Sequence, residues 1–167
     1  SSAINDAPVY SGLPSSAQGS NYYNHIGYVD NTYGVGSLLV KFPALKSNTL
    51  FNGLSDSRIN SVTFNVEKIG GSNSYSSTLR AYRYTGSSWS ESTVTYNSAA
   101  VDSYTGSLVS SVSMTSNTWY SFDITSVAKA WKNGTASYDS GLVIKNATNT
   151  TNNLYERVLA SVEYGKS

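Results

Sequence analysis

One segment of the chain, residues 119–134, changes its hydrophobic period from that of a strand to that of a helix. Its first part alternates apolar and polar residues, with apolar side chains at Tyr120, Phe122 and Ile124. Its second part places apolar side chains on one helical face, at Val127, Ala128 and Trp131. Thr125 or Ser126 can cap the start of the helix, and Gly134 can adopt the left-handed conformation that ends it. The pattern predicts a strand followed by one short helix near residues 125–133.

Short alternating segments separated by Gly, Ser and Asn fill most of the remaining chain, and no other window shows the helical period. We expect strands in residues 22–30, 37–42, 59–69, 78–85, 108–114, 140–148 and 155–164, and a short strand within residues 87–97. Residues 45–57 form a long connection that can contain a helical turn. Many short strands with regular turn signals predict an all-β sandwich or barrel.

The inward positions of these strands define the predicted core. We expect two antiparallel sheets packed face to face around Val62, Phe64, Val66, Phe122, Ile124, Val158 and Val162. The facing of residues 78–85 is ambiguous, because Leu79 and Ala81 favour one register whereas Tyr82 and Tyr84 favour the other.

The length of 167 residues fits one domain. Residues 1–21 are rich in turn-forming residues and are interpreted as a lead-in, in which Val9 and Tyr10 can start an edge strand. Residues 22–167 are expected to form a single β-sandwich domain.

Composition narrows the class of partner. Charged residues make up 13% of the chain, the net charge is +1 and no basic run occurs, which argues against nucleic acid. No apolar run approaches the length of a membrane span, so no membrane partner is expected. A surface of Ser, Thr, Asn and Gly suits an extracellular protein. Tyrosine is abundant, with 14 Tyr against 4 Phe and 3 Trp, and its flat face with a polar tip suits a hydroxyl-rich ligand.

Several segments together resemble a known family. They are residues 37–42 (SLLVKF), 59–66 (INSVTFNV), 89–96 (WSESTVTY), 119–134 (WYSFDITSVAKAWKNG), 141–145 (GLVIK) and 158–164 (VLASVEY). In order and spacing they resemble the DNRLRE-type domains of bacterial secreted and cell-wall proteins. That group overlaps a carbohydrate-binding module family with alginate-binding members.

The resemblance implies a jelly-roll-like antiparallel β-sandwich and a non-catalytic module of a bacterial extracellular or cell-surface protein. The implied ligand is a plant or algal polysaccharide, and the implied module is a monomer joined to neighbouring modules. Residues 1–30, 70–77 and 97–106 depart from the family pattern, and its arginine-bearing end is reduced here to Glu156 and Arg157. The ligand can therefore differ from those of the relatives. The alternative function is a structural spacer or adhesion domain that binds no glycan.

The sequence lacks the residue patterns of two kinds of catalytic site, a Ser-His-Asp triad and a pair of glycosidase carboxylates. His25 is the only histidine, and no Gly-x-Ser-x-Gly motif accompanies it. The ten acidic residues are scattered and lie mostly in turns, which does not suit a pair of glycosidase carboxylates. We interpret Glu91 and Asp123 as acceptors for N–H groups of turns or helix starts. The protein is therefore expected not to be an enzyme.

No cofactor is expected, and metal sites are limited to one alternative. The absence of cysteine excludes thiolate ligands and disulfides. Structural calcium is an alternative to solvated turn aspartates at Asp30, Asp56, Asp102 and Asp139. A Lys–Asn isopeptide crosslink through Lys41 or Lys145 is a further alternative.

The candidate ligand-binding residues follow from an expectation about the three tryptophans. Trp89, Trp119 and Trp131 lie in the family-like segments and are expected to pack in the core. A sugar-stacking surface would then be built from tyrosines outside those segments: Tyr22, Tyr23, Tyr75 and Tyr104. Arg80 and Arg83 are second candidates, which could bind an acidic sugar. The alternative is that these tyrosines only cover loop edges.

Overall fold

The structure is a computed structural model that describes residues 3–162 and residue 164. Its strands are β1 (Asn5–Tyr10), β2 (Tyr23–Tyr28), β3 (Val35–Lys41), β4 (Thr63–Gly70), β5 (Ser77–Tyr84), β6 (Thr105–Met114), β7 (Trp119–Asp123), β8 (Leu142–Asn146) and β9 (Arg157–Ala160). Its helices are α1 (Pro43–Ser47), α2 (Thr49–Gly53), α3 (Tyr96–Ala99) and α4 (Thr125–Lys132), with 3₁₀ turns η1 (Asp56–Arg58) and η2 (Asn153–Tyr155). Within the described residues, no helix is long and apolar enough to cross a membrane.

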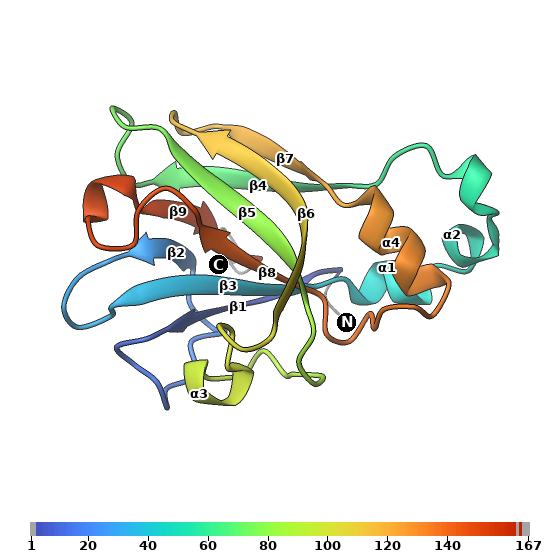
Figure 1. Cartoon of the computed structure of the whole chain (residues 1–167), viewed down its shortest axis with the longest axis horizontal. Helices are drawn as coiled ribbons and strands as arrows, with labels where there is room; N and C mark the ends of the chain where they lie inside the picture. Colours follow the sequence, from blue (N-terminus) through green and yellow to red (C-terminus); the bar gives the residue numbers. More distant parts are fainter. Residues whose placement is uncertain (1–2, 163, 165–167) are drawn as a thin grey trace.

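The strands form an antiparallel sheet that curves into a nearly closed sandwich or barrel (Figure 1). The strand order is β6-β5-β8-β3-β2-β9-β4-β7, and β1 pairs with β3. The two ends of this order meet, because β6 lies beside β7 and the Ser110 hydroxyl accepts a hydrogen bond from the Asp123 N–H at 3.2 Å. The predicted all-β antiparallel sandwich is therefore confirmed.

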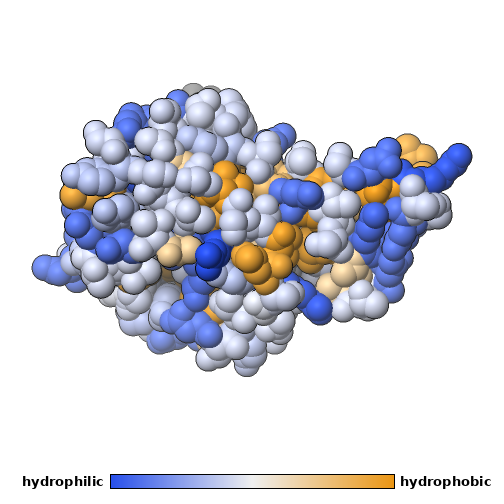
Figure 2. Space-filling view, turned by 45° about the horizontal axis from the view of Figure 1, so that its top comes forward, coloured by the Kyte–Doolittle hydropathy of each residue, from blue (hydrophilic) through white to orange (hydrophobic). Residues whose placement is uncertain are grey.

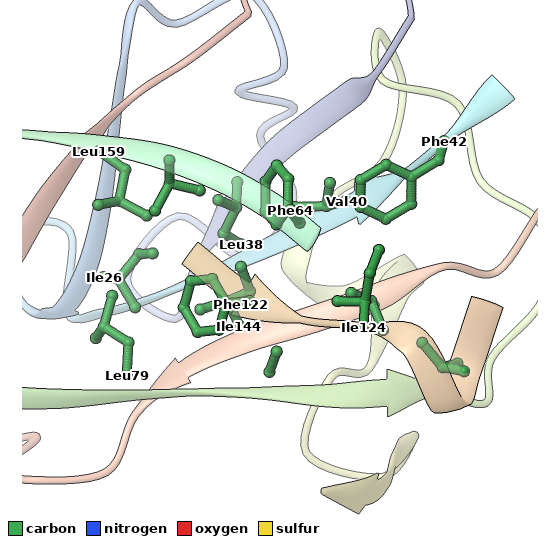
Figure 3. Close-up of a cluster of buried hydrophobic side chains, with 14 of the residues drawn as sticks. Ile26, Leu38, Val40, Phe42, Phe64, Leu79, Phe122, Ile124, Ile144 and Leu159 are labelled. Carbon is green, nitrogen blue, oxygen red and sulfur yellow. The ribbon is translucent and has the colours of Figure 1, made fainter. Parts of the chain in front are cut away.

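The inner core lies between the two halves of this sheet (Figure 3). Phe64 and Phe122 are directly opposite each other on β4 and β7, and Phe42 packs edge-on against Phe64. Phe64, Val66, Phe122 and Ile124 are buried in this cluster as predicted, and Val62 packs against it.

The predicted facing of the last strand is wrong. Leu159 points into the inner core, whereas Val158 lies on the opposite face of β9 and Val162 is half-buried after the strand ends. The pairing with β2 sets this facing, because Leu159 is opposite Asn24, next to the inward Ile26. The predicted strand continued to residue 164, and residue 163 lies outside the described residues.

A second cluster covers the other face of β1, β3, β5 and β8. It contains Ala7, Val9, Leu39, Tyr84, Trp89, Val94, Ala99, Val101 and Val143. Strand β5 is therefore covered on both faces: Leu79 and Ala81 lie in the inner core, and Tyr84 lies in the second cluster. This double burial explains its ambiguous pattern.

The N-terminal region contributes to this second cluster. Strand β1 contains the predicted Val9 and Tyr10 but already begins at Asn5, and it pairs along β3. The strand predicted within residues 87–97 is absent there, because Thr95 and Ser98 form a capping box that starts α3 instead.

The predicted helix is confirmed as α4, and Gly134 has the left-handed backbone (φ 73°) expected at its end. The predicted cap is wrong, since Ile124 occupies the N-cap position without a side-chain bond. The Thr125 hydroxyl instead accepts from the Val62 N–H, and Asp123 accepts from the Thr125 N–H. The expected role of Asp123 is thus confirmed.

The three tryptophans differ in burial. Trp89 and Trp131 are buried as expected. Trp119, however, is 65% exposed, so its predicted core packing is wrong. On β7 the inward side chains are Tyr120 and Phe122, and strand alternation turns Trp119 outward.

Candidate functional site

Two of the predicted ligand-binding residues, Tyr22 and Tyr23, lie side by side in a surface depression. The depression has a volume of about 520 Å³ and is lined by Tyr10, Ser20, Asn21, Tyr22, Tyr23, His25, Val29, Asp30 and Tyr33. We call it the tyrosine groove. Its exposed aromatic side chains are Tyr22, Tyr23 and Tyr33, with exposures of 54%, 50% and 37%.

Strand β2 positions one wall of the tyrosine groove. Tyr23 and His25 point to the outer face of β2. Asn24 and Ile26, which alternate with them along the strand, are buried. The Tyr23 ring also packs against Tyr164, with the ring centroids 6.0 Å apart.

The turn between β2 and β3 positions the opposite wall. The Oδ1 atom of Asp30 accepts hydrogen bonds from the N–H groups of Thr32 and Tyr33, each at 2.8 Å, which fixes the turn. The Tyr33 ring then packs edge-on against Tyr10, with centroids 5.3 Å apart. These contacts hold Tyr33 in place before any ligand binds.

The base of the tyrosine groove is formed by hydrogen-bonded side chains. Tyr10 is almost completely buried, and its hydroxyl accepts from the His25 N–H at 3.3 Å. Burial raises the pKa of Tyr10 far above its ordinary value, and the Glu156 charge adds to the rise, so the phenol keeps its proton. The His25 Nδ1 atom lies 2.5 Å from the Glu156 carboxylate, which orients the imidazole.

A second depression adjoins the tyrosine groove and shares Tyr22 and Ser20 with it. It has a volume of about 350 Å³, and its other lining residues are Gly19, Glu91 and Ser92. The backbone at position 19 lies so close to Glu91 that only glycine fits, since a Cβ atom there would lie 1.9 Å from the Glu91 carbonyl oxygen. Tyr22 thus lies between two depressions, and a ligand can contact its side chain from either one.

The Glu91 carboxylate helps to fix this region. It accepts from the Asp6 N–H and from the Asn5 side-chain amide, both at 3.2 Å. The expected acceptor role is therefore correct, but the N–H group belongs to strand β1 rather than to a turn or helix start.

The other predicted ligand-binding residues lie elsewhere. Tyr75 packs edge-on against Tyr155, and Tyr104 packs edge-on against Tyr84. Arg80 is exposed on β5, and Arg83 on the same strand donates to the Thr135 carbonyl at 3.0 Å. Two strands, β8 and β3, separate β5 from β2, so the structure does not bring the arginines to the tyrosine groove.

Arg157, which follows Glu156 in the segment that replaces the arginine-bearing end of the family pattern, has a structural role. Arg157 is fully buried, and its guanidinium donates to the carbonyls of Met114, Glu156 and Tyr75. It therefore joins the β4–β5 loop, which carries Tyr75, to β6 and β9.

The aspartates considered for calcium lie apart and have other partners. Asp56, Asp102 and Asp139 pair with Lys132, Lys145 and Lys46 respectively. The hydrogen bonds from Lys145 and Tyr96 lower the pKa of Asp102. Among residues 3–162 and 164, no group of three His, Cys, Asp or Glu side chains could hold a metal ion.

The lysines considered for a crosslink also have partners of other kinds. Lys41 donates to the Trp89 carbonyl and lies over its ring, and Lys145 donates to Asp102 and Thr105.

Sequence reasoning missed Tyr10, His25 and Tyr33 as members of the tyrosine groove. The Asp30-x-x-Tyr33 spacing is a recognisable turn signal, but it does not show which surface the turn contacts. That contact depends on the pairing of β1 with β3, which brings Tyr10 opposite Gly36.

Comparison with known families identifies the class of protein. The family model for carbohydrate-binding module family 96 matches residues 28–165. The chain belongs to this family. The expected resemblance to a carbohydrate-binding module family is thereby confirmed, whereas the closer relation to DNRLRE-type domains stays a prediction. No curated protein matches the chain.

Membership in a carbohydrate-binding module family agrees with the failure of catalytic templates in the sequence. The tyrosine groove lies across the start of the family match. Val29, Asp30 and Tyr33 fall within the matched residues, whereas Tyr10, Tyr22, Tyr23 and His25 precede them. Part of this surface therefore belongs to a segment that the family match does not cover.

Proposed function

We propose that this carbohydrate-binding module uses the tyrosine groove to bind a plant or algal polysaccharide. The observation that carries the proposal is that three exposed tyrosines surround one depression with hydrogen-bonding groups at its base and rim. A pyranose ring has an apolar face that stacks on an aromatic plane and hydroxyl groups that need polar partners. Asn21, Asp30 and His25 supply such partners beside the rings.

The setting of the module is part of the proposal. The surface is rich in Ser, Thr, Asn and Gly and poor in charge, which suits an extracellular location, and Figure 2 shows hydrophobic residues only as small patches on the viewed face. The resemblance to DNRLRE-type domains supports a bacterial secreted or cell-surface protein in which a monomeric, non-catalytic module is joined to others.

The binding partner is tested by affinity electrophoresis in gels that contain alginate, laminarin, xylan, galactomannan or homogalacturonan. We expect retarded migration in at least one gel. A module that migrates freely in all of them would favour the spacer or adhesion function instead.

The binding surface is tested with single variants Y22A, Y23A and Y33A on the retained polysaccharide. Loss of one stacked ring should weaken binding about three- to tenfold, or ~0.7–1.4 kcal/mol, which lies within the range of an aromatic contact. The melting temperature of Y22A and Y23A should stay near that of the parent, because half of each side chain is exposed.

Two variants serve as controls for this surface. Y104A removes a similarly exposed tyrosine that packs against Tyr84, and R80A removes the arginine proposed for acidic sugars. Neither should change the affinity. If R80A weakened binding to alginate while Y22A did not, the site would lie on β5 and the proposed placement would be wrong.

A further inference from the structure

The outer face of β2, β9, β4 and β7 carries a row of side chains that begins at the tyrosine groove. Tyr23 is opposite Ala160, and Glu67 is opposite Trp119. Because Lys68 pairs with Leu159, the next residues along the two strands, Glu67 and Ala160, also lie opposite each other. We call Tyr23, Ala160, Glu67 and Trp119 the cross-strand row.

All four side chains of the cross-strand row lie on the same face. Their neighbours along the strands, Asn24, Leu159, Val66 and Tyr120, are buried or pack against the inner core. The residues of the row therefore point away from it. The two aromatic members are the most accessible, with half of Tyr23 and 65% of Trp119 exposed.

The spacing of the two aromatic side chains suits an extended ligand. Tyr23 and Trp119 are separated by three strand spacings, or about 14 Å. This distance exceeds the length of a disaccharide, so one ligand can reach both rings only if it is a longer chain. Between them lie the small Ala160 side chain and the Glu67 carboxylate, which can accept hydrogen bonds from hydroxyl groups.

A hollow of about 200 Å³ adjoins three members of the cross-strand row, since Ala160, Glu67 and Trp119 all line it. Asn24 lines the same hollow, and its buried Oδ1 atom has no hydrogen-bond partner among the described residues. Buried polar atoms are normally paired. Because Asn24 is fully buried and points to the inner side of the sheet, this atom marks a polar position inside the hollow and does not lie on the face of the cross-strand row.

From this arrangement we infer that Trp119 is a second stacking position for the same polysaccharide chain, which crosses the strands from the tyrosine groove along the cross-strand row. This inference rests on the proposed function of the tyrosine groove and extends it to a ligand class, a polysaccharide of at least several sugar units. It also gives the exposed tryptophan a role that a core residue could not have.

The test compares ligand lengths by isothermal titration calorimetry. The probes are the hexasaccharides of alginate, laminarin, xylan, mannan and homogalacturonan, each with its disaccharide. We expect the parent to bind one hexasaccharide, and W119A to bind it about three- to tenfold more weakly with no change for the disaccharide. Y22A should weaken both lengths, and W119Y should restore much of the lost hexasaccharide affinity because it keeps a flat ring.

The matched control is L108A, which removes an exposed apolar side chain on β6, beside β7. It should bind like the parent. If W119A bound the hexasaccharide like the parent while Y22A bound it weakly, the cross-strand row would be refuted and the tyrosine groove retained. If neither variant lost affinity, or the parent bound none of the probes, both the row and the proposed groove would fall.

Discussion

Trp119 and Trp131 lie at the two ends of one continuous segment, yet one is 65% exposed and the other is 3% exposed. Trp131 is on the apolar face of α4 with Val127 and Ala128 and contacts Phe42 and Tyr138. Trp119 starts β7 on the face opposite to Phe122. The local hydrophobic period therefore decides the environment of each tryptophan, and residue type alone does not.

The largest expected effect in this comparison is the loss of stability in W131A. Removing a fully packed indole leaves a cavity, so the free energy of unfolding should fall by ~3–5 kcal/mol. Urea denaturation of the parent and the variant measures this loss. A variant that unfolds at the parental urea concentration would show that Trp131 does not pack in the core.

W131F should have a smaller effect on the same free energy of unfolding. The Trp131 Nε1 atom is buried without a hydrogen-bond partner among the described residues. Phenylalanine keeps part of the ring contacts and removes the unpaired N–H, so the expected loss is about 1 kcal/mol. A loss as large as that of W131A would instead indicate that the indole N–H is hydrogen-bonded in solution.

The sequence predicts an element of this fold well when that element has one clearly buried face. Strong periods in residues 63–70 and 119–132 predicted β4, β7 and α4, because each of these elements has one clearly buried face. The pattern of β5 was uninformative because a second cluster covers its outer face. In β9 the predicted facing was wrong by one residue, so Val158 was expected in the core where Leu159 lies. Only the pairing of β9 with β2 shows the correct facing.

The candidate site was less predictable than the fold. Exposure of Tyr22 and Tyr23 could be expected from their polar surroundings, but their neighbours Tyr10 and Tyr33 come from other elements. Long-range strand pairing brings these residues together, and no local pattern encodes it. For Trp119 the information was present, since it has the parity of the outward Ser121 and Asp123, but the expectation that tryptophan is buried outweighed it.

The smallest expected effect is on the stability of W119A. Because most of the Trp119 side chain is exposed, its removal should change the free energy of unfolding by no more than about 0.5 kcal/mol. The measurement is the same urea denaturation used for W131A, so that the two tryptophans are compared under one condition. A loss above ~2 kcal/mol would mean that Trp119 packs against the sheet in solution, as is usual for tryptophan. With stability unchanged, any loss of hexasaccharide affinity in W119A can be assigned to a missing contact with the ligand rather than to unfolding.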